Sequence, residues 1–583
     1  MANPTNANVA KLLEDIADLL EVKGESVFRV RAYRDAARSI ESLPDDIGGF
    51  VEAGGDLCDI PRVGESIAAK IREYLQTGHL GYLDDLASEV SPGLAEMLSV
   101  PGLGPKKAQL FHEALGIDSV EKLEEAARDH RLSTLPKIGA KTEENILDAI
   151  ERMHARPGRT PLGIALPGAL PFLRAVMNLK EVRDAGLAGS LRRMVETIGD
   201  LDLLASSDEP EKVIDAFTRF SMVKSVLGHG PTKGTIVTKD NLQVDLRVIK
   251  PHEWGAGLQY FTGSKQHNIH LRSIAEGMGL KVNEYGIFRV SDNERIAGET
   301  EESMYQALGL EMIPPELRED RGEFEAARDG RLPRLVQRSD IRGDLHVHTD
   351  WSDAADTPEV MVKAALDLGY EYVAISDHSV SMGFVHGLTT DRIREQRVLI
   401  DDLNRRHPNI HVFQGIEVNI RGDGTLDYDD DVLSRFDVVT ASIHSGMGMP
   451  MDRMTKRIIK AITNPHVDVL GHPTGRLIES REPYQVDLEA VFRAAAETGT
   501  AMEINAQPDR LDLKDTDARR ARDLGVMLVI NSDAHSADQY NVMEYGVATA
   551  RRGWVEPWNL INTMHLNDLI RWLQDRQVSR RAA

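Results

Sequence analysis

The sequence predicts a multidomain protein in which an all-α N-terminal region is followed by an α/β unit and then by an atypical seven-unit β/α barrel. Three observations predict this fold class. The chain has 583 residues, whereas a single hydrophobic core rarely organises more than about 300. Proline and glycine turns recur between amphipathic helical stretches before residue 150, as in a helical region. Beyond residue 160, strand-like apolar segments alternate with helices, as in α/β architectures.

Composition limits the class of protein and the kinds of site. With 41% hydrophobic and 28% charged residues, the chain has the composition of an ordinary soluble globular protein. Cys58 is the only cysteine, which excludes an internal disulfide framework and a thiolate zinc site and fits a reducing compartment. The N-terminus shows no signal-peptide pattern, and no apolar run of about 18 residues occurs. We therefore expect a cytoplasmic protein without a membrane partner.

The formal net charge of −24 argues against indiscriminate binding to nucleic acid, because contact with phosphates normally uses a positive face. Local basic runs do occur, and Arg29, Arg31, Arg34 and Arg38 fall at near-helical spacing. Alone, such a run is more often a solvated helix face. Any DNA binding must therefore use local patches or backbone N–H groups.

Three similar turns in the helical region predict a repeated module. Each turn contains Pro-x-x-Gly and precedes a helical stretch; the turns are Ile60–Gly64, Val100–Gly104 and Leu135–Gly139, and the helices are Ser66–Tyr74, Lys106–Leu115 and Thr142–Met153. The pattern resembles the helix–hairpin–helix module, whose glycines permit a tight turn and whose next helix offers free N–H groups to a DNA phosphate. Gly102 and Gly104 form the full Gly-x-Gly, so we expect them to bind DNA. Arg62 and Lys137 replace the first glycine in the other copies.

The α/β unit extends from about residue 160 to 325. Its expected strands are Gly199–Ala205, Gly234–Val237, Gln243–Ile249 and Gly286–Val290. Residues 314–340 are rich in Pro, Arg, Glu and Asp and lack apolar periodicity, which indicates a linker.

Seven apolar strand-like segments recur between helices in the last part of the chain. They are Asp344–His348, Tyr372–Ser376, His411–Gly415, Val438–Ser442, Val467–Gly471, Ala501–Asn505 and Met527–Asn531. This rhythm predicts a parallel β/α barrel, and seven units rather than eight make it atypical. In such a barrel, residues at the carboxyl ends of the strands gather around one pocket.

Three carboxylates in the α/β unit form the first candidate metal site. Asp200 and Asp202 stand two residues apart, so they share one face of a strand. Asp245 lies in a second strand-like segment, residues 242–248. Three converging carboxylates suit two Mg²⁺ ions about 3.5–4 Å apart, because hard oxygen ligands leave coordination positions free for phosphates. The alternative, a solvent-facing pair at a strand end, is the commoner meaning of Asp-x-Asp alone.

The residues around these carboxylates resemble the nucleotidyltransferase palm of family X DNA polymerases. The resemblance rests on Gly-Ser-Leu-Arg-Arg at 189–193, Gly-Asp-Leu-Asp at 199–202 and Tyr-Phe-Thr-Gly-Ser at 260–264. It implies that Asp200 and Asp202 hold two Mg²⁺ or Mn²⁺ ions. Asp245 would bind the catalytic ion and help to deprotonate the primer 3′-hydroxyl.

The same resemblance implies the nucleotide and DNA contacts. Ser190 and Arg193 would bind the outgoing phosphates, and Tyr260 would screen the sugar. Asn268 would contact the incoming base, and Arg272 would reach the template strand. Lys265 departs from the acidic residue of the animal members. The remaining expected contacts are Gly199, Phe261, Gly263 and, on a weaker Arg-x-Pro match, Arg159.

The N-terminal helices also resemble the small domain of this family, which grips the 5′ phosphate of a gap. Lys70 matches the position of a lysine that removes a 5′-deoxyribose phosphate through a Schiff base. Arg29 and Ser66 stand where the animal members carry lysine. An ordinary helix lysine near phosphate therefore stays open as the alternative interpretation of Lys70.

The barrel supplies the second candidate metal site. Nine residues lie at or just after the carboxyl ends of predicted strands: His346, His348, Asp353, His378, Glu417, His444, His472, Asp533 and His535. A single histidine is more often structural. Nine such residues at successive strand ends are hard to explain by packing, because a barrel gathers these positions around one pocket.

These nine residues resemble the PHP family, named for polymerase and histidinol phosphatase. The resemblance implies three divalent ions, Mn²⁺, Zn²⁺ or Fe²⁺, among which the ligand type does not distinguish. Glu417 would bridge two of them. The implied ligand groups are His346, His348, Glu417 and Asp533 for the first ion, Glu417, His444 and His472 for the second, and Asp353, His378 and His535 for the third.

Together, the two halves resemble the bacterial PolX proteins, family X DNA polymerases with a C-terminal PHP domain. This implies template-directed gap filling in base excision repair, coupled to a manganese-stimulated 3′→5′ exonuclease, with abasic-site endonuclease or 3′-phosphatase activity as further options. Expected partners are gapped or nicked DNA and deoxynucleoside triphosphates, and we expect a monomer. Two alternatives stay open: a small-molecule phosphatase tethered to DNA, and an inactive gap-binding scaffold.

The predicted domain bounds follow from these assignments. They are 1–80 for the gap-binding helical domain with the first hairpin, 81–155 for the helix–hairpin–helix region, 156–255 for the palm, 256–320 for the nucleotide-selecting domain, 321–340 for the linker and 341–583 for the PHP domain.

Overall fold

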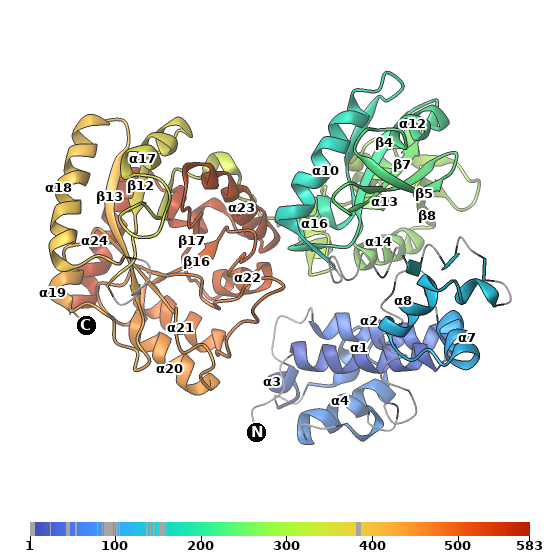
Figure 1. Ribbon diagram of the computed structural model, residues 1–583, viewed down its shortest axis with the longest axis horizontal. Helices are drawn as coiled ribbons and strands as arrows, with labels where there is room; N and C mark the ends of the chain where they lie inside the picture. Colours follow the sequence, from blue (N-terminus) through green and yellow to red (C-terminus); the bar gives the residue numbers. More distant parts are fainter. Residues whose placement is uncertain are drawn as a thin grey trace. The chain divides into compact units, whose positions relative to one another are not determined.

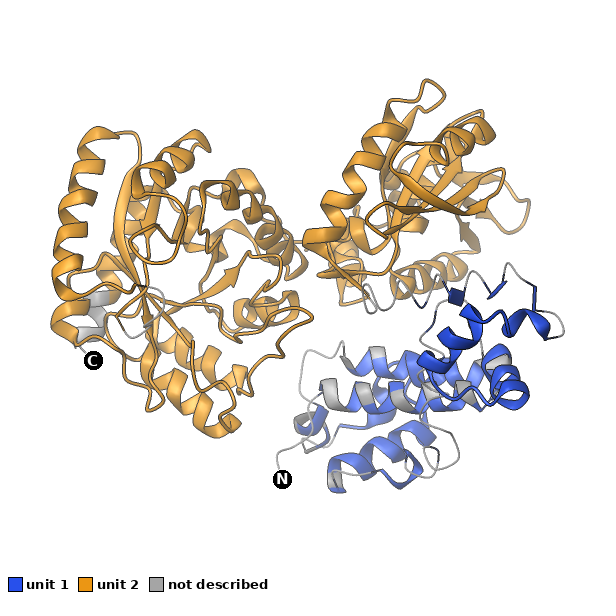
Figure 2. Ribbon diagram, viewed as in Figure 1, with its two compact units in different colours: residues 1–158 blue, residues 159–583 orange. Residues whose placement is uncertain are grey.

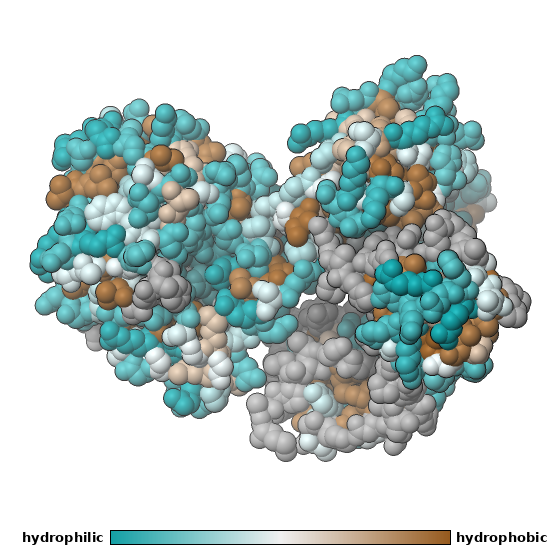
Figure 3. All heavy atoms as spheres, in the orientation of Figure 1, coloured by the Kyte–Doolittle hydropathy of each residue, from teal (hydrophilic) through white to brown (hydrophobic). Residues whose placement is uncertain are grey.

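A computed structural model describes residues 6–23, 25–41, 47–52, 55–77, 80–83, 86, 97, 100, 103, 105–135, 138–139, 142–143, 146–147, 150, 159–380 and 386–582. The chain forms two compact units, residues 1–158 and residues 159–583 (Figure 2). No helix in the described ranges is both long and apolar enough to cross a membrane. Figure 3 shows hydrophilic and hydrophobic residues interspersed over the described part of one face.

The first unit is helical, as predicted. Its helices are α1 (Asn6–Val22), α2 (Val27–Glu41), α3 (Ile47–Glu52), α4 (Glu65–Thr77), α7 (Pro105–Leu115) and α8 (Val120–Arg128), with the short turns η1 (Leu57–Asp59) and η2 (Leu132–Thr134). Helix α2 is capped by Ser26, whose hydroxyl accepts a hydrogen bond from the Arg29 N–H at 3.3 Å. Buried Leu13, Ile16 and Tyr33 belong to the core that joins α1, α2 and α4.

Of the three predicted turns, the structure describes every residue only of the first, Ile60–Gly64. The first turn is well defined: the Val63 N–H donates to Ile60 O at 3.1 Å, and the Ile67 N–H donates to Gly64 O at 2.9 Å. Gly102 and Gly104 lie outside the described residues, as does much of the helix expected over 142–153.

The second unit begins with a five-stranded sheet in the order β2-β4-β7-β6-β5. Its strands are β2 (Asp184–Leu187), β4 (Leu201–Ser206), β5 (Val223–His229), β6 (Lys233–Thr238) and β7 (Gln243–Ile249), and the small pair β1 (Thr160–Pro161) and β3 (Thr197–Ile198) lies outside it. Strands β4 and β7 are parallel, and the other pairs are antiparallel. Helices α10 (Leu162–Met177) and α12 (Pro210–Phe217) pack their apolar faces into the core of this sheet (Figure 1).

A mixed subdomain follows the sheet. It contains η3 (Pro251–Glu253), α13 (Trp254–Thr262), α14 (Lys265–Gly277), the antiparallel strands β8 (Leu280–Asn283), β9 (Gly286–Arg289) and β10 (Arg295–Ala297), then α15 (Glu301–Gln306) and η4 (Pro315–Leu317). Over 321–340, where the sequence indicates a linker, the structure has helix α16 (Glu323–Arg328) and η5 (Arg338–Asp340). Phe324 is fully buried in the core of this subdomain together with Trp554 of the barrel. A helix this short leaves too few apolar residues to show a period.

The C-terminal part is a nearly closed, seven-stranded parallel barrel in sequence order, so the predicted fold class is confirmed. Its strands are β11 (Gly343–Val347), β12 (Tyr372–Ile375), β13 (His411–Asn419), β14 (Val438–Ser442), β15 (Val469–Leu470), β16 (Ala501–Asn505) and β17 (Leu528–Asn531). The first and last strands meet through a parallel bridge between Val347 and Ala534.

Helices surround these strands (Figure 1). They are α17 (Pro358–Asp367), α18 (Thr390–Arg406), α19 (Asp430–Leu433), α20 (Met451–Ile462), α21 (Leu488–Thr498), α22 (Asp515–Asp523), α23 (Met543–Arg552) and α24 (Leu566–Ala582), with η6 (Ala537–Val542), η7 (Pro557–Asn559) and η8 (Ile561–Thr563) between the last of them. Because the strands are buried apart from the two end residues of β13, polar groups at the strand ends have few ways to meet water. This makes the carboxyl edge a natural place for a metal site.

Candidate metal centres

The three predicted carboxylates meet at one end of the five-stranded sheet. Asp202 on β4 lies opposite Asp245 on the parallel strand β7, and Asp200 precedes β4 by one residue. Lys233 on β6 forms a 2.8 Å ion pair with the Asp245 carboxylate. The sequence prediction did not include Lys233, because its position depends on the pairing of β6 with β7.

The electrostatics of these carboxylates favour a bound cation. Burial, with the charges of Asp200 and Asp245, raises the pKa of Asp202 to about 7. Burial and Asp245 also raise the pKa of Asp200. A divalent ion would remove this repulsion, and carboxylate oxygens are the ligands that Mg²⁺ prefers. In the described chain, the groups of three or more ligand residues whose ligand atoms all lie within 4.8 Å of one another are in the barrel, so Asp200, Asp202 and Asp245 do not converge that closely.

A tight turn lies against Asp202. Gly189 begins α11 (Gly189–Arg192) with φ of 59°, and a Cβ at this position would stand 2.0 Å from an Asp202 carboxylate oxygen. Only glycine tolerates both the positive φ and this approach. Ser190 and Arg193, the expected phosphate ligands, follow Gly189 in this turn, and Arg193 lies close enough for its charge to act on Asp202.

The two arginines of this turn have different partners. Arg192 donates to both Glu301 oxygens at 2.8 and 2.6 Å and to the Thr262 hydroxyl at 2.7 Å. Arg193 donates from Nε to Glu319 at 3.0 Å and from Nη1 to the Thr262 carbonyl. Arg192 is therefore a structural link to the next subdomain.

Arg159, Gly199 and Arg193 lie near one another at this end of the sheet. Arg159 donates from Nε to the Thr197 hydroxyl at 2.9 Å, and a Cβ on Gly199 would lie 3.9 Å from its Nη1. Burial, and then the like charge of Arg193, lower the pKa of Arg159. Two adjacent guanidinium groups favour an anionic ligand.

The expected sugar- and base-contacting residues lie around the junction of α13 and α14. The rings of Tyr260 and Phe261 meet edge to face with centroids 5.2 Å apart. Asn268 donates to Tyr260 O at 2.7 Å and accepts from Gln259 at 2.8 Å. Gly263 has φ of 67°, and a Cβ there would lie 3.3 Å from Arg193 Nη1. Arg272 lies one turn beyond Asn268 on α14.

Lys70 lies in an aromatic setting in the first unit. Its Nζ donates to the Ser66 hydroxyl and carbonyl, both at 3.2 Å, and lies 4.5 Å from the centre of the Tyr82 ring. Arg29 donates to the Tyr82 hydroxyl at 3.0 Å. Tyr82 was not predicted from sequence, because it lies outside the motif around Lys70.

Glu417 lies at the centre of the barrel site. Three imidazole nitrogens approach its carboxylate: His378 Nδ1 at 2.8 Å, His472 Nε2 at 2.9 Å and His444 Nε2 at 3.2 Å. His346 Nε2 and His348 Nε2 lie 3.7 and 3.8 Å from it.

Two aspartates complete the barrel cluster. Asp533 lies 3.1 Å from His348 and 3.7 Å from His346. Asp353 lies 3.4 Å from His378 and 3.5 Å from His535. The compact groups are His346, His348 and Asp533; His378, Glu417 and His444; and His348, Asp353, His378 and His535. His348 and His378 each belong to two groups, unlike the ligand division that the resemblance implies.

Several features of the cluster fit metal ligation. His346 Nε2 and both ring nitrogens of His348 are buried without a hydrogen-bond partner in the part of the chain that the structure describes, an arrangement that a metal ion would satisfy. Burial and the neighbouring His535 and His378 lower the pKa of His348 to about 3. Asp533 and His472 have positive φ, 51° and 27°, a strained conformation that is common at functional sites.

Two buried carboxylates outside the nine expected ligands support them. Glu503 accepts hydrogen bonds from His346 Nδ1 and from the His472 N–H, both at 2.7 Å. Asp377 accepts from the Ser352 hydroxyl at 2.6 Å and from the Thr349 N–H at 2.8 Å, and so fixes the loop that leads to Asp353. Glu503 was omitted from the predicted site although it lies in a predicted strand, because its role depends on contacts with neighbouring strands.

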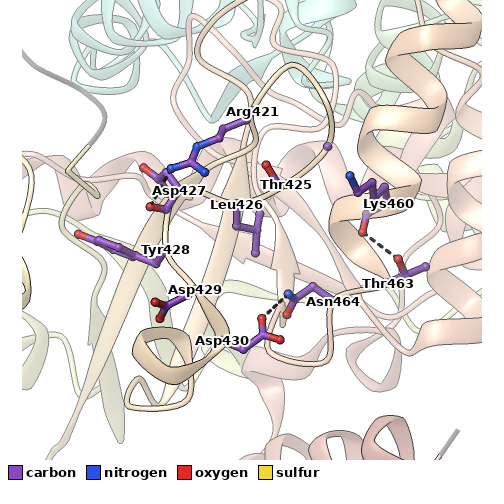
Figure 4. Close-up of a pocket in the computed structure, with 11 residues that line it drawn as sticks. Arg421, Thr425, Leu426, Asp427, Tyr428, Asp429, Asp430, Lys460, Thr463 and Asn464 are labelled. Atoms are coloured by element: carbon purple, nitrogen blue, oxygen red, sulfur yellow. Dashed lines mark hydrogen bonds between the residues drawn. The ribbon is translucent and has the colours of Figure 1, made fainter.

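A separate pocket of about 610 Å³ lies on the barrel and shares no residue with this cluster (Figure 4). It is lined by acidic and hydroxyl side chains with Arg421 and Lys460. Asp430 accepts a 2.9 Å hydrogen bond from Asn464 across it. The nine predicted metal ligands lie elsewhere.

Comparisons with known families match most parts of the chain. Residues 4–80 match a profile described as "Helix-hairpin-helix domain", and residues 94–152 match "SAM-like Helix-hairpin-helix tandem". Residues 257–319 match "DNA polymerase beta thumb", and residues 344–507 match "PHP domain".

Individual relatives agree with these matches. The chain is 38% identical over 569 residues to "DNA polymerase/3'-5' exonuclease PolX" of Bacillus subtilis (strain 168), which covers 97% of this chain and 99% of that protein. It is 24% identical over 340 residues to "DNA polymerase lambda" of Rattus norvegicus, covering 53% of this chain and 56% of that protein. A "Probable phosphatase" of Thermoanaerobacter sp. (strain X514) is 29% identical over 232 residues, 38% of this chain and 89% of that protein.

Proposed function

The chain belongs to the bacterial family X DNA polymerases that carry a C-terminal PHP domain, and from this premise we propose that it fills short gaps in DNA and removes nucleotides from the primer 3′ end. It is a DNA polymerase that uses divalent metal ions and acts on DNA with deoxynucleoside triphosphates. The exonuclease, the place in base excision repair and the residue roles below belong to the proposal.

The placement of Asp202 opposite Asp245, beneath the Gly189 turn, supports nucleotide addition most directly. Bound Mg²⁺ or Mn²⁺ would bring the 3′-hydroxyl and the triphosphate together and stabilise the developing charge. Asp200, Asp202 and Asp245 would hold these ions, and Asp245 would accept the proton of the 3′-hydroxyl. Ser190, Arg193 and Arg159 would bind the leaving phosphates, and Gly199 would allow their approach.

Selection of the nucleotide would fall to the α13–α14 junction. Tyr260 and Phe261 would form the wall beside the sugar, with Gly263 providing the turn between the two helices. Asn268 would contact the incoming base, and Arg272 would contact the template strand. The bonds that Asn268 makes to Gln259 and Tyr260 would hold its amide in place.

For the barrel we propose hydrolysis of the 3′-terminal phosphodiester. The nine ligands would hold divalent ions that supply the attacking water and bind the phosphate, and imidazole with carboxylate suits Mn²⁺, Zn²⁺ or Fe²⁺. Glu417 would bridge ions, since five histidines surround its carboxylate. Abasic-site endonuclease and 3′-phosphatase activities are further options for the same chemistry.

The deciding experiment uses a one-nucleotide gapped duplex with a 5′-labelled primer. In Mg²⁺ with triphosphates, the primer should lengthen by one nucleotide. In Mn²⁺ without triphosphates, it should shorten stepwise. A chain that binds the gap without lengthening the primer would be a scaffold, contrary to this proposal.

A second candidate is a small-molecule phosphatase tethered to DNA. It is favoured by the similarity of the barrel to the "Probable phosphatase". Rapid release of phosphate from small esters, with an intact primer in Mn²⁺, would support this alternative and remove the exonuclease from the proposal.

For Lys70 we propose a Schiff base with a 5′-deoxyribose phosphate, in which Ser66 and Tyr82 position the amine. Borohydride should trap the wild-type protein on an incised abasic duplex, and Lys70→Ala should not be trapped. Equal trapping of both would leave Lys70 as a phosphate-contacting lysine. A cytoplasmic location and a monomeric state complete the proposal.

A further inference from the structure

A chain of five alternating charges joins the polymerase part to the barrel within the second unit. Arg552 of α23 donates to Glu319 at 3.0 Å and to Asp515 at 2.8 Å. Glu319 also accepts from Arg193 at 3.0 Å, and Asp515 accepts from Arg321 at 3.1 Å. Each carboxylate therefore stands between two arginines.

These charges are largely removed from water, and Arg552 is only 8% exposed. Burial alone would raise the pKa of Glu319, but Arg552 and Arg193 outweigh it and lower that pKa. A buried ion is costly unless it is paired and hydrogen-bonded. The position of each side chain is therefore tied to that of its neighbours, and Arg193 cannot shift freely while Glu319 is held by Arg552.

The barrel also holds the backbone of the same turn. Arg552 Nη1 donates to the Arg193 carbonyl at 2.9 Å. Three residues later, Glu196 accepts a 2.7 Å hydrogen bond from Arg476, which follows β15 in the barrel and also bonds Leu511 O. These contacts hold the segment between Ser190 and Asp200 against the barrel. This segment connects the expected phosphate ligands to the metal-binding carboxylates.

We propose that Arg552 is a positioning residue for nucleotide addition, which holds the Arg193 carbonyl and, through Glu319, the Arg193 guanidinium in the geometry that binds the triphosphate. This inference rests on the proposed polymerase function and adds to it a role for the barrel that is independent of hydrolysis. Two of the three nitrogens of Arg193 are engaged, with Glu319 and Thr262, so its orientation is fixed before a nucleotide binds.

The test compares full-length wild type, Arg552→Met and Arg552→Lys on a one-nucleotide gap, with kcat and KM for the triphosphate measured separately. Arg552→Met should raise that KM and lower kcat/KM by about 10- to 100-fold, as expected for a displaced substrate ligand. Arg552→Lys should recover part of the loss, since an ammonium can reach Glu319 but cannot bond both carboxylates and the carbonyl in one plane. Release of 3′ nucleotides in Mn²⁺ should stay within about twofold of wild type, because the described contacts of Arg552 include no metal ligand of the barrel.

Arg576→Met is the matched control. Arg576 is equally buried, at 7% exposure, and its bonds to Asp468 and Val467 O stay inside the barrel. This control should lower the melting temperature at least as much as Arg552→Met and leave KM for the triphosphate unchanged. An equal rise in KM in both variants would show a general loss of stability and overturn the proposal.

A double-mutant cycle with Arg193→Ala tests the route of the effect. If Arg552 acts through the Arg193 guanidinium, Arg552→Met should cause a smaller loss in the Arg193→Ala background than in wild type, and the remainder measures the bond to the backbone carbonyl of residue 193. Fully additive losses in kcat/KM would overturn the proposal, as would wild-type values of kcat and KM in both Arg552→Met and Arg552→Lys. If Arg552→Met does not fold, Arg552→Lys takes its place in the double-mutant cycle. A wild type that binds the gap but adds no nucleotide would instead overturn the proposed polymerase function, and this inference with it.

Discussion

Glu503 accepts a 2.7 Å hydrogen bond from His346 Nδ1, and its other oxygen accepts the backbone N–H of His472. It thereby fixes which nitrogen of His346 faces the barrel cluster and makes that nitrogen a better donor to a metal ion. This one carboxylate of β16 therefore bonds both β11, which carries His346, and the segment just after β15, which carries His472.

We expect Glu503→Gln to weaken metal binding in the barrel by about 10- to 100-fold, the usual cost of losing a carboxylate behind a ligating histidine. Titration of 3′-nucleotide release with Mn²⁺ measures this shift. Glu489→Gln is the control, because Glu489 pairs with Arg520 and Arg493 on the outer helices. Unchanged Mn²⁺ dependence in Glu503→Gln would contradict a supporting role.

His444→Ala should abolish 3′-nucleotide release and leave gap filling at the wild-type rate. His444 approaches Glu417 to 3.2 Å and belongs to a compact group with His378, so its loss would open one coordination position. His407→Ala serves as the comparison, since His407 pairs with Glu359 away from the cluster. Retention of nuclease activity in His444→Ala would remove this residue from the ligand set.

Asp245→Ala should reduce gap filling by at least about a thousandfold, because losing a group that stabilises transition-state charge costs 10²–10³ and the proton acceptor is lost as well. Nuclease activity in the barrel should persist. Asp208→Ala is a fair control, since Asp208 pairs with Arg183 at the surface. Primer extension near the wild-type rate in Asp245→Ala would refute the proposed role.

Gly189→Ala should abolish synthesis by moving Asp202. The added Cβ would meet the Asp202 carboxylate at 2.0 Å in a backbone with φ of 59°, and the left-handed conformation alone costs about 1–2 kcal/mol for a residue with a side chain. Gly277→Ala is the control, because a Cβ added there, at the end of α14, would meet no described atom within 4 Å. Denaturant melts and primer extension measure both effects, and an active Gly189→Ala would show that the turn can relax.

Lowering the pH should weaken the ion pairs that Arg552 makes with Glu319 and Asp515 between the polymerase part and the barrel. Arg552 and Arg193 outweigh burial and lower the pKa of Glu319, and Arg552 and Arg321 do the same for Asp515. A carboxyl group whose pKa is lower in the folded state stabilises the fold above its unfolded pKa, about 4, and loses that contribution as pH falls through the folded value.

The expected measurement is the free energy of unfolding at about pH 6 and pH 3.5. The free energy of unfolding of wild type should exceed that of Arg552→Met by about 1–3 kcal/mol at the higher pH, and this difference should be smaller at the lower pH. A difference that does not change with pH would mean that these carboxylates keep ordinary pKa values.

Much of the fold and of the candidate sites could be predicted from local sequence patterns. The seven barrel strands were found because each is a short apolar run between helices, and the nine candidate ligands because they sit at the ends of those runs. Asp200 and Asp202 were found because a spacing of two places side chains on one face of a strand. Each of these inferences needs only neighbouring residues.

Contacts between segments that are distant in the sequence could not be predicted. Lys233 reaches Asp245 through the pairing of β6 with β7, and Glu503 meets His346 across the barrel. Arg552 meets Glu319 only because α23 packs beside the segment expected to be a linker. A single sequence without strand registers or packing does not specify such partners.

The bridge between Val347 and Ala534 closes the barrel by joining its first strand to its last. His346 and His348 belong to the first strand, so they are translated early in this domain. Asp533 and His535 are translated near the end of the domain. The polymerase part depends on the same late segment, because Trp554 completes the core around Phe324 and Arg552 bonds Arg193 O and Glu319. Both candidate metal centres therefore wait for the last part of the chain before their surroundings are complete.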